Sequence, residues 1–441
     1  MSAKKPRQYY EEVLNTLQEH HKAFSGFIPL IASENVPSPA VREALTTDFG
    51  NRYAEGWVGE RVYAGCEFID KVEFTVIELM KKLFKCEFVD PRPISGVVAN
   101  LVVYTAFTDP GDTVMALPIT TGGHISYAPK KLHGTAGAVH GLEVEYLPLD
   151  YDEMNIDVDR TRKRLKKLVQ DEGIKPKMVI FGGSVFPFPH PVKELADDFK
   201  SLGTIIHYDS AHVSGLIAGG QFQDPLAEGA DTVTVSTHKT FFGPQHGSVL
   251  SWDKYSDPIK TATLPGLCSN HHLHAVAGLA IACAEMLEFG EEYAKQVIKN
   301  SQALGAALYS RGFKVLAEHK GFTKSHVLLI DISKYGLGGD VERELERAGI
   351  IINRNLLPWD KKEGRDYHNP GGIRLGTAEV TRLGMKEGEM DEIAALMERV
   401  VVKKEDPVKV RPDVEAMKSE YQTVHYCFEN TTKAYEYVKI R

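Results

Sequence analysis

Two segments of the sequence each lead from a candidate β-strand to a residue that can do chemistry. The strand-like run at 204–208 is followed by Asp209, and the alternating run at 232–235 leads to Lys239. At the carboxyl edge of neighbouring strands such a pair suits pyridoxal phosphate, because a lysine can form a Schiff base with the aldehyde while a carboxylate pairs with the pyridinium nitrogen. A structural ion pair would explain these two residues about as well.

Three further segments offer groups that could bind a phosphate, a planar ring or a carboxylate. Ser95 and Gly96 precede an apolar helical run at 97–108, where the free N–H groups of a helix start could hold a phosphate; an ordinary N-cap is the plainer alternative. His124 follows two glycines and could stack on a ring or lie at the surface. Arg374 lies between apolar residues in "GGIRLGT", and its planar fork suits an amino-acid carboxylate better than a lysine would.

These residues need a framework that brings strand ends together. Short apolar runs alternate with amphipathic ones in the middle of the chain, which predicts an α/β fold with a mostly parallel sheet covered by helices on both faces. Ligands bind beyond the carboxyl ends of the strands in such sheets. The predicted strands are 113–116, 143–147, 178–181, 204–208, 232–235 and 248–252, and the predicted helices include 158–170 and 192–202.

A second, smaller α/β domain is predicted in the C-terminal part of the chain. A chain of 441 residues exceeds the size at which one core usually stops growing. A long helical stretch at 274–310 is followed by strand-like runs at 325–332 and 350–352 and by a helix at 387–401. We therefore predict an N-terminal arm with a large cofactor-binding domain, residues 1–288, and a small C-terminal domain, residues 289–441.

Composition limits the class of protein and its partners. The net charge of −8 argues against nucleic acid as a partner, and no apolar run reaches the roughly 20 residues of a membrane span. The five cysteines are scattered without a CxxC pair, as free thiols of a reducing compartment would be. With a charged, amphipathic start and no evident export signal, the sequence predicts a cytoplasmic enzyme without a membrane partner.

A histidine run at 271–274 raises the question of a metal. His271 and His274 are spaced to share one helical face, but no carboxylate or cysteine accompanies them at ligand spacing. We therefore predict no metal site.

Several longer motifs carry a resemblance to one family. The chain resembles the serine hydroxymethyltransferases, which are fold-type I pyridoxal-phosphate enzymes, and its loops resemble those of archaeal members. The similarity runs in the family's order across about residues 28–385. It is carried by "LIASENVPSPAV" (30–41), "NRYAEGWVGERVYAGCEFID" (51–70), "SGVVANLVVY" (95–104), "DPGDTVMAL" (109–117), "GGHISY" (122–127), "DSAHVSGLIAGG" (209–220), "STHKTFFGP" (236–244), "NRNLLP" (353–358) and "GGIRLGT" (371–377).

The resemblance implies how the cofactor pyridoxal 5'-phosphate is held. Lys239 would be the Schiff-base lysine, Asp209 the partner of the pyridine nitrogen and His124 the residue that stacks on the ring. Ser95 and Gly96 would hold the phosphate. The fold implied is a large domain with a mostly parallel sheet flanked by helices and a smaller C-terminal α/β domain.

The resemblance also implies the substrate and the reaction. His212 and Ser184 would contact the phenolic oxygen of the cofactor or the substrate, and Ser33 and Arg374 would bind the substrate carboxylate. The implied reaction is the reversible interconversion of serine and glycine, with transfer of the one-carbon unit to a reduced pterin as co-substrate. That carrier would be tetrahydrofolate or a modified archaeal pterin.

A second group of residues is implied to act across a subunit interface. Glu55 would be the acid/base at the hydroxymethyl group of the substrate, with Tyr53 and Tyr63 lining the substrate side, and Asn355 would contact the pterin. Tyr53 and Glu55 would reach in from the partner subunit, which makes a homodimer with shared active sites the minimal active unit. The alternative for Glu55 is a salt bridge with Arg52 or Arg61.

The departures from the family pattern lie around the phosphate and the carrier. Val97 and Val98 stand where the family usually has serine and glutamine, and Asn270 falls where a glycine amide normally meets the phosphate. Val62 replaces an aromatic residue that often packs on the pterin. Val62 and the altered loop at 265–278 are the only support for one alternative, a pterin-independent aldolase for 3-hydroxy amino acids. A catalytically silent moonlighting or RNA-binding relative is a second alternative. The acidic net charge weighs against it, as does the intact set of Lys239, Asp209, His124 and Arg374.

Overall fold

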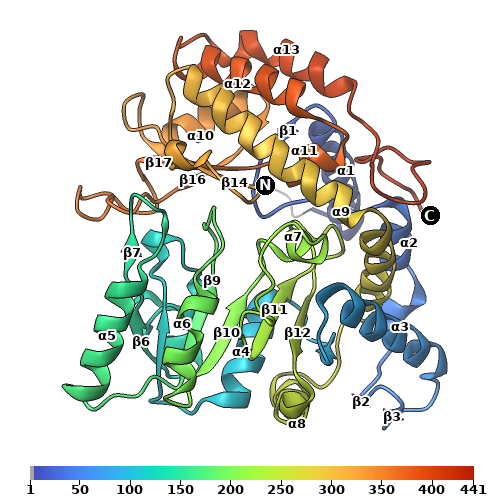
Figure 1. The fold of residues 1–441 in the computed structure, drawn as a ribbon. Coiled ribbons are helices and arrows are strands. Elements are labelled where there is room, and N and C mark those ends of the chain that lie inside the picture. Colours follow the sequence, from blue (N-terminus) through green and yellow to red (C-terminus); the bar gives the residue numbers. More distant parts are fainter. Residues whose placement is uncertain (1–3) are drawn as a thin grey trace.

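The computed structural model describes residues 4–441 and is built around a seven-stranded sheet (Figure 1). Residues 1–3 of the predicted arm lie outside the described residues. The strand order is β4-β12-β11-β10-β9-β5-β6. The strands are β4 (Phe88–Asp90), β5 (Thr113–Ala116), β6 (Glu143–Tyr146), β9 (Met178–Gly182), β10 (Ile205–Asp209), β11 (Thr232–Ser236) and β12 (Gly247–Ser251).

The sheet is parallel except at one strand. The pairs from β11 to β6 are all parallel, whereas β12 runs antiparallel to both β11 and β4. The prediction of a mostly parallel sheet is confirmed, and the six predicted strands match to within two residues at each end. Strand β4 was not predicted, because three residues give too short an apolar pattern to distinguish from a loop.

Helices cover both faces of this sheet, as the sequence predicted. One face packs against α4 (Gly96–Phe107) and α8 (Ser256–Thr261). The other face packs against α3 (Glu67–Phe84), α5 (Val158–Gln170), α6 (Val192–Lys200) and α7 (Ser214–Ala218). Helix α5 shows why the pattern was readable: Asp157 caps its first turn, and Thr161, Leu165 and Leu168 recur on one buried side.

A second hydrophobic core lies above the first in Figure 1 and is formed by the C-terminal part of the chain. Its antiparallel sheet has the order β13-β14-β17-β16, from β13 (Lys314–Val315), β14 (Val327–Asp331), β16 (Asn353–Asn355) and β17 (Gly372–Gly376). Its helices are α10 (Gly338–Arg347), α11 (Ala378–Arg382), α12 (Glu387–Val401) and α13 (Pro407–Ser419).

The N-terminal segment also reaches this second core. Strand β1 (Ile28–Pro29) pairs in parallel with β15 (Ile350–Ile351), and Ile28 and Leu30 are fully buried there. The segment before it is α1 (Pro6–Phe24), and the segment after it is α2 (Pro39–Leu45). Two small hairpins complete the strands, β2 (Gly56–Trp57) with β3 (Glu60–Arg61) and β7 (Leu149–Asp150) with β8 (Asn155–Ile156).

Helix α9 (Leu273–Ser310) joins the two cores and runs between them in Figure 1. By length and composition alone it could cross a membrane, but more than half of its most apolar stretch is buried inside the protein. Its buried residues from Val276 to Val297 contribute to the first core, and Leu304, Ala307 and Leu308 near its C-terminus contribute to the second. The predicted domain boundary at 288/289 falls inside this helix and stays a prediction.

Candidate active site

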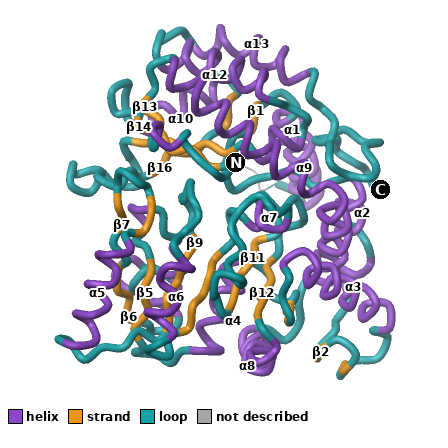
Figure 2. The backbone as a smooth tube through the Cα atoms, in the orientation of Figure 1, coloured by secondary structure: helices purple, strands orange, loops and turns teal. Residues whose placement is uncertain are grey.

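The carboxyl ends of the central strands surround a cavity of about 190 Å³. These ends run into the loops drawn in teal beneath the C-terminal part of the chain in Figure 2. The lining comes from the start of α4, the loop after β5, and the ends of β9, β10 and β11. Of the predicted site residues, Ser95, Gly96, His124, Ser184, Asp209, His212 and Lys239 line this cavity.

Asp209 ends β10 and is held by two donors. Its Oδ2 accepts a hydrogen bond of 2.9 Å from Nδ2 of Asn100, and its Oδ1 accepts one of 3.0 Å from the backbone N–H of Ala211. The side chain is buried, and β10 lies directly beside β11, so the predicted pairing of neighbouring strand ends is confirmed. Donors of this kind favour the charged form of a carboxylate.

Lys239 lies three residues beyond the end of β11 and lines the cavity. Burial lowers the pKa of its amine to about 8, and the Arg374 charge acts in the same direction, while the Asp209 carboxylate opposes the shift. The backbone carbonyl of Lys239 accepts a hydrogen bond of 2.6 Å from Nδ2 of Asn35, which fixes the chain beside the amine. A lysine of this kind is a nucleophile near neutral pH.

The start of α4 lies against the end of β11. Ser95 is the N-cap, and its hydroxyl oxygen accepts a hydrogen bond of 3.2 Å from the backbone N–H of Val98. A Cβ on Gly96 would collide with the hydroxyl of Ser236 in its present orientation, so glycine lets the helix start and the end of β11 approach closely without moving that side chain. Ser95 is thus an ordinary N-cap, as the alternative interpretation predicted. The same helix start also faces the cavity, where Val97 and Val98 offer no side-chain donors and only backbone N–H groups could bind a phosphate.

The loop after β5 carries His124 to the cavity. Gly122 has a φ of +102°, and its carbonyl accepts the backbone N–H of Ser184 at 2.7 Å, so this loop is fastened to the end of β9. His124 Nδ1 lies 2.8 Å from the hydroxyl of Ser126. Burial lowers the pKa of His124, so its ring is neutral at pH 7 and can lie against another flat ring.

Arg374, at the centre of β17, brings a half-buried positive charge to the same region. Its Nε donates to Oδ1 of Asn353 at 3.1 Å, and its guanidinium donates to the carbonyl of Ser184 at 3.1 Å. Burial lowers its pKa to about 10, which leaves the group charged at pH 7. Its hydrogen-bond partners within residues 4–441 are two neutral oxygens, so an anion is the missing partner.

Two stacked histidines connect the strand ends with the N-terminal segment. His212 Nδ1 lies 3.4 Å from His326 Nε2, which also donates to the carbonyl of Ala32 at 3.0 Å. Burial lowers the pKa of His326 to about 3 and moves that of His212 in the same direction, so both are neutral at pH 7. This contact places the segment around Ser33 beside the cavity.

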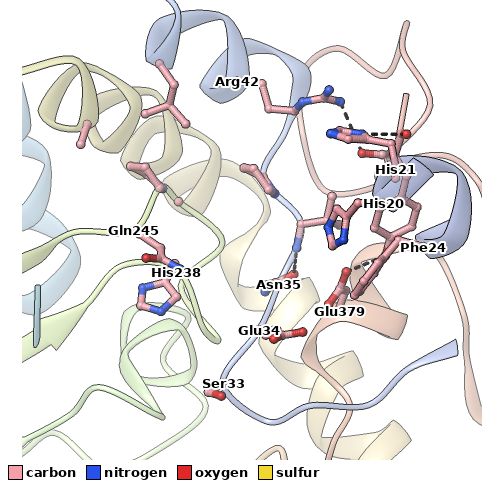
Figure 3. Close-up of a pocket in the computed structure, with 18 of the residues that line it drawn as sticks. His20, His21, Phe24, Ser33, Glu34, Asn35, Arg42, His238, Gln245 and Glu379 are labelled. Carbon is pink, nitrogen blue, oxygen red and sulfur yellow. Dashed lines mark hydrogen bonds between the residues drawn. The ribbon is translucent and has the colours of Figure 1, made fainter. Parts of the chain in front are cut away.

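Ser33 itself lines a larger neighbouring cavity of about 600 Å³, shown in Figure 3. His238 lines both cavities, which makes them neighbours. The larger one is enclosed by α1, the segment after β1, the loop after β11 and the C-terminal tail, where Tyr435 donates to the buried Glu379 at 2.5 Å. The structure does not bring Ser33 into the smaller cavity with Lys239.

Five predicted site residues line neither cavity in a single chain: Tyr53, Glu55, Tyr63, Asn355 and Arg374, the last of which reaches the smaller cavity only through its hydrogen bond to the carbonyl of Ser184. The rings of Tyr53 and Tyr63 lie 5.0 Å apart and are exposed. Asn355 is at the end of the edge strand β16 and donates to the carbonyl of Leu356 at 2.8 Å.

Asn270 occupies the loop before α9 and binds the segment around Glu55. Its side chain accepts the backbone N–H of Ala54 at 3.1 Å and donates to the carbonyl of Arg52 at 3.2 Å. The hydroxyl of Tyr53 donates to Ser269 at 2.8 Å. The departure at Asn270 therefore ties the 265–272 loop and the Tyr53–Glu55 segment into one unit.

Buried charges beneath this unit correct two sequence-based interpretations. Arg61 pairs with Asp70 at 2.8 Å and with Glu73 at 2.5 Å, and Arg52 pairs with Asp48, so both arginines have carboxylate partners other than Glu55. His271 binds Glu73 at 2.5 Å and lies before α9, which begins at Leu273. The prediction that His271 and His274 share a helical face was wrong, because the helix starts two residues later.

Comparison with known proteins decides the family. A family model described as serine hydroxymethyltransferase matches residues 7–397. The serine hydroxymethyltransferase of Nitrosopumilus maritimus is 57% identical over 441 residues, which cover 100% of both chains. The chain belongs to the serine hydroxymethyltransferase family. The relative of the same name from Korarchaeum cryptofilum is 58% identical over 439 residues, 98% of this chain and 100% of the relative, and that of Cenarchaeum symbiosum is 57% identical over 435 residues, 99% and 98%.

Membership of the serine hydroxymethyltransferase family confirms the predicted fold-type I class, the pyridoxal-phosphate-dependent transferase class and the likeness to archaeal members. It supports the hydroxymethyltransferase prediction and not the aldolase alternative. Enzymes of this family use pyridoxal phosphate and a folate-type one-carbon carrier.

The smaller cavity fits that cofactor on the chemistry of its donors. It combines a lysine amine of lowered pKa, a buried carboxylate and a helix start, and His238 adds a buried Nδ1 without a partner among residues 4–441. The sequence analysis assigned no role to Asn100 or Asn35, although both lie in segments that resemble the family, 95–104 and 30–41. An asparagine within an otherwise apolar helical run was the available signal for Asn100, because a buried amide needs polar partners.

Substituting Arg374 by lysine should raise the Michaelis constant for serine about 10- to 100-fold, with little effect on cofactor content. The loss of a forked, charge-assisted contact to a carboxylate corresponds to about 1.5–3 kcal/mol. Steady-state kinetics at saturating carrier measure the effect. Arg354→Lys, on the neighbouring strand β16, is the matched control and should leave the constant within about two-fold. An unchanged constant in Arg374→Lys would place the carboxylate site elsewhere.

Proposed function

We propose that the strand-end cavity holds pyridoxal 5'-phosphate and that the chain interconverts serine and glycine there. When bound, this cofactor draws electrons away from the α-carbon of the amino acid. Lys239 would hold its aldehyde, Asp209 would face the pyridine nitrogen, and His124 would lie on the ring. The backbone N–H groups at Ser95 and Gly96 would donate hydrogen bonds to the phosphate. The observation that carries the proposal is the half-buried, charged Arg374 near Lys239, which has no carboxylate partner within residues 4–441.

The amino-acid substrate would lie between the cofactor and β17. Arg374 and Ser33 would bind its carboxylate, and the neutral His212 and Ser184 would contact the cofactor's phenolic oxygen or the substrate. Ser33 lines the neighbouring cavity, so residues 30–35 would have to move toward Arg374 before both side chains could bind the same carboxylate. Bound substrate would supply the negative charge that the half-buried guanidinium of Arg374 lacks as a partner.

The residues that miss the cavity in one chain support a homodimer with shared sites. Helix α1 has no buried residue, and it exposes Tyr10, Val13 and Leu17. Tyr53, Val62, Tyr63 and Phe68 form a second exposed apolar group around Glu55. A partner chain covering these surfaces would remove apolar area from water. In this arrangement Glu55 and Tyr53, carried by the unit that Asn270 ties together, serve the partner's cavity.

Loss of the hydroxymethyl group of serine requires a proton acceptor for its hydroxyl, and Glu55 would take this part, with Tyr63 beside it. The one-carbon unit would pass to a reduced pterin that Asn355 contacts. The cytoplasmic location, and a partner set without nucleic acid, membrane or metal, stay predictions. No group of three or more metal-ligating side chains occurs in the described part of the chain, residues 4–441.

One assay tests the proposed reaction. Purified protein is mixed with serine and with each of several reduced pterins, tetrahydrofolate included, and glycine formation is followed; allo-threonine cleavage without pterin is the control. We expect a pterin to accelerate serine cleavage by at least about 100-fold, since capture of formaldehyde drives the step. Cleavage of allo-threonine with no pterin effect on serine would instead establish the aldolase.

A further inference from the structure

Asn100 occupies a position beneath Asp209 at which every polar atom of its side chain is used. It lies on α4, is buried, and its amide nitrogen donates to Oδ2 of Asp209 at 2.9 Å and to the hydroxyl of Ser126 at 2.9 Å. Its Oδ1 accepts from the hydroxyl of Thr234 at 2.7 Å and from Nε2 of His207 at 3.1 Å. Two donors and two acceptors exhaust the capacity of an asparagine amide.

The surrounding groups fix which way this amide points. The carboxylate of Asp209 can only accept, so the nitrogen of Asn100 must face it. The oxygen then faces His207, whose Nδ1 lies 2.9 Å from the hydroxyl of Thr232 and whose Nε2 must carry the proton. Burial lowers the pKa of His207 to about 4, so this ring is neutral at pH 7 and holds a single tautomer.

The fold supplies this network from the sheet beneath the site. His207 and Asp209 are two residues apart and therefore lie on the same face of β10. The register places them opposite Thr232 and Thr234 on β11. Helix α4 packs on that face and places the side chain of Asn100 in contact with it. The buried amide is therefore held by two strands at once and cannot turn away from Asp209 without leaving several buried groups unpaired.

The same amide reaches the second residue that faces the cofactor cavity. Ser126, which accepts from Asn100, has its hydroxyl 2.8 Å from Nδ1 of His124. One side chain thus touches the carboxylate at one edge of the cavity and, through one hydroxyl, the imidazole above it.

We propose that Asn100 is a positioning residue that holds the Asp209 carboxylate in one orientation, toward the ring nitrogen of the bound cofactor. The inference rests on the proposed pairing of Asp209 with that nitrogen. Asn100 also lines the cavity beside Asp209, and it is assigned no part in the reaction itself. Its amide donates a hydrogen bond to Oδ2 of Asp209, and the fixed orientation prevents that carboxylate from turning toward another partner.

The test compares two cofactors on the full chain after cofactor removal. Dissociation constants are measured for pyridoxal phosphate and for its 1-deaza analogue, in which a C–H replaces the ring nitrogen. The ratio of the two constants reports the carboxylate–nitrogen pairing without any turnover. We expect Asn100→Ala to reduce this preference for the natural cofactor roughly ten-fold, the size of a charge-assisted hydrogen bond.

Two variants separate positioning from loss of structure. Asn100→Leu fills the space that alanine would leave empty and should reduce the preference equally. Asn300→Ala removes a buried asparagine of the second core, which donates to Thr381 at 2.8 Å and to the carbonyl of Met385 at 2.9 Å, and should leave the preference unchanged. Thermal unfolding of the cofactor-free proteins records the stability cost of each substitution.

Asp209→Ala keeps this inference apart from the proposed function. If Asp209→Ala abolishes the preference but Asn100→Ala and Asn100→Leu weaken both cofactors equally, Asn100 is a structural residue and the positioning role is overturned. If Asp209→Ala leaves the preference intact, the pairing of Asp209 with the ring nitrogen is itself wrong.

Discussion

Substitution of Lys239 by alanine should give a folded protein that has lost the visible absorbance of bound cofactor and nearly all turnover. The lysine amine is the group in the cavity that can bond to the aldehyde, and burial has lowered its pKa to about 8 so that it is ready to do so. Absorbance after reloading with pyridoxal phosphate, and serine cleavage, measure both effects. Borohydride followed by peptide mapping should label Lys239 in the parent protein; a labelled lysine in the variant would identify another anchor.

A second buried lysine provides the control for this substitution. Lys418 lies in the second core, donates to the carbonyl of Tyr421 at 2.9 Å and has its pKa lowered by burial to about 8 as well. Lys418→Ala removes a similar lysine that does not line the smaller cavity, and the folded fraction should keep its absorbance and turnover. The rate of cofactor loading into the parent protein should rise with pH, reach half of its maximum near pH 8 and level off above about pH 9, because only the neutral amine of Lys239 attacks.

Glu55→Gln should reduce pterin-dependent serine cleavage by about 100-fold or more while sparing much of any allo-threonine cleavage, with cofactor still bound. Serine releases formaldehyde, whose capture needs an acid/base group at the hydroxyl and at the carrier, and general acid–base catalysis contributes about 10²–10⁴ in rate. Allo-threonine releases a more stable aldehyde that depends less on capture. Parallel assays of both substrates measure the difference, with Glu60→Gln on the same hairpin as the control.

Mixed dimers test whether Glu55 acts across the interface. A dimer of one Glu55→Gln chain and one Lys239→Ala chain has one site with both wild-type residues if Glu55 serves the partner, and that dimer should recover up to half the activity. If Glu55 serves its own chain, both sites carry one substitution each and the mixed dimers stay inactive. Equal loss of both reactions in Glu55→Gln alone would make Glu55 a structural residue.

Local sequence pattern determined the framework of this protein. Alternation of threonine and valine at 232–235, and the capped amphipathic pattern of 158–170, report burial that repeats every two or every 3.6 residues, so the elements were predictable to within about two residues. The order of the motifs along the chain was equally informative, because it can be compared with a family without knowledge of the fold. It placed Lys239, Asp209, His124 and Arg374 in one family's pattern before any geometry was known.

What the residues touch was decided only by the tertiary structure. Asn100 and Asp209 are 109 residues apart in sequence, and no local pattern announces that the helix carrying one will pack on the strand ending with the other. From the sequence, Arg61 could have paired with Glu55, but the fold places Asp70 and Glu73 beside it instead. The fold also brings Asn270 to the backbone of Ala54, next to Glu55. Side-chain partners depend on how elements pack, and that packing minimises the free energy of the whole chain rather than of any one segment.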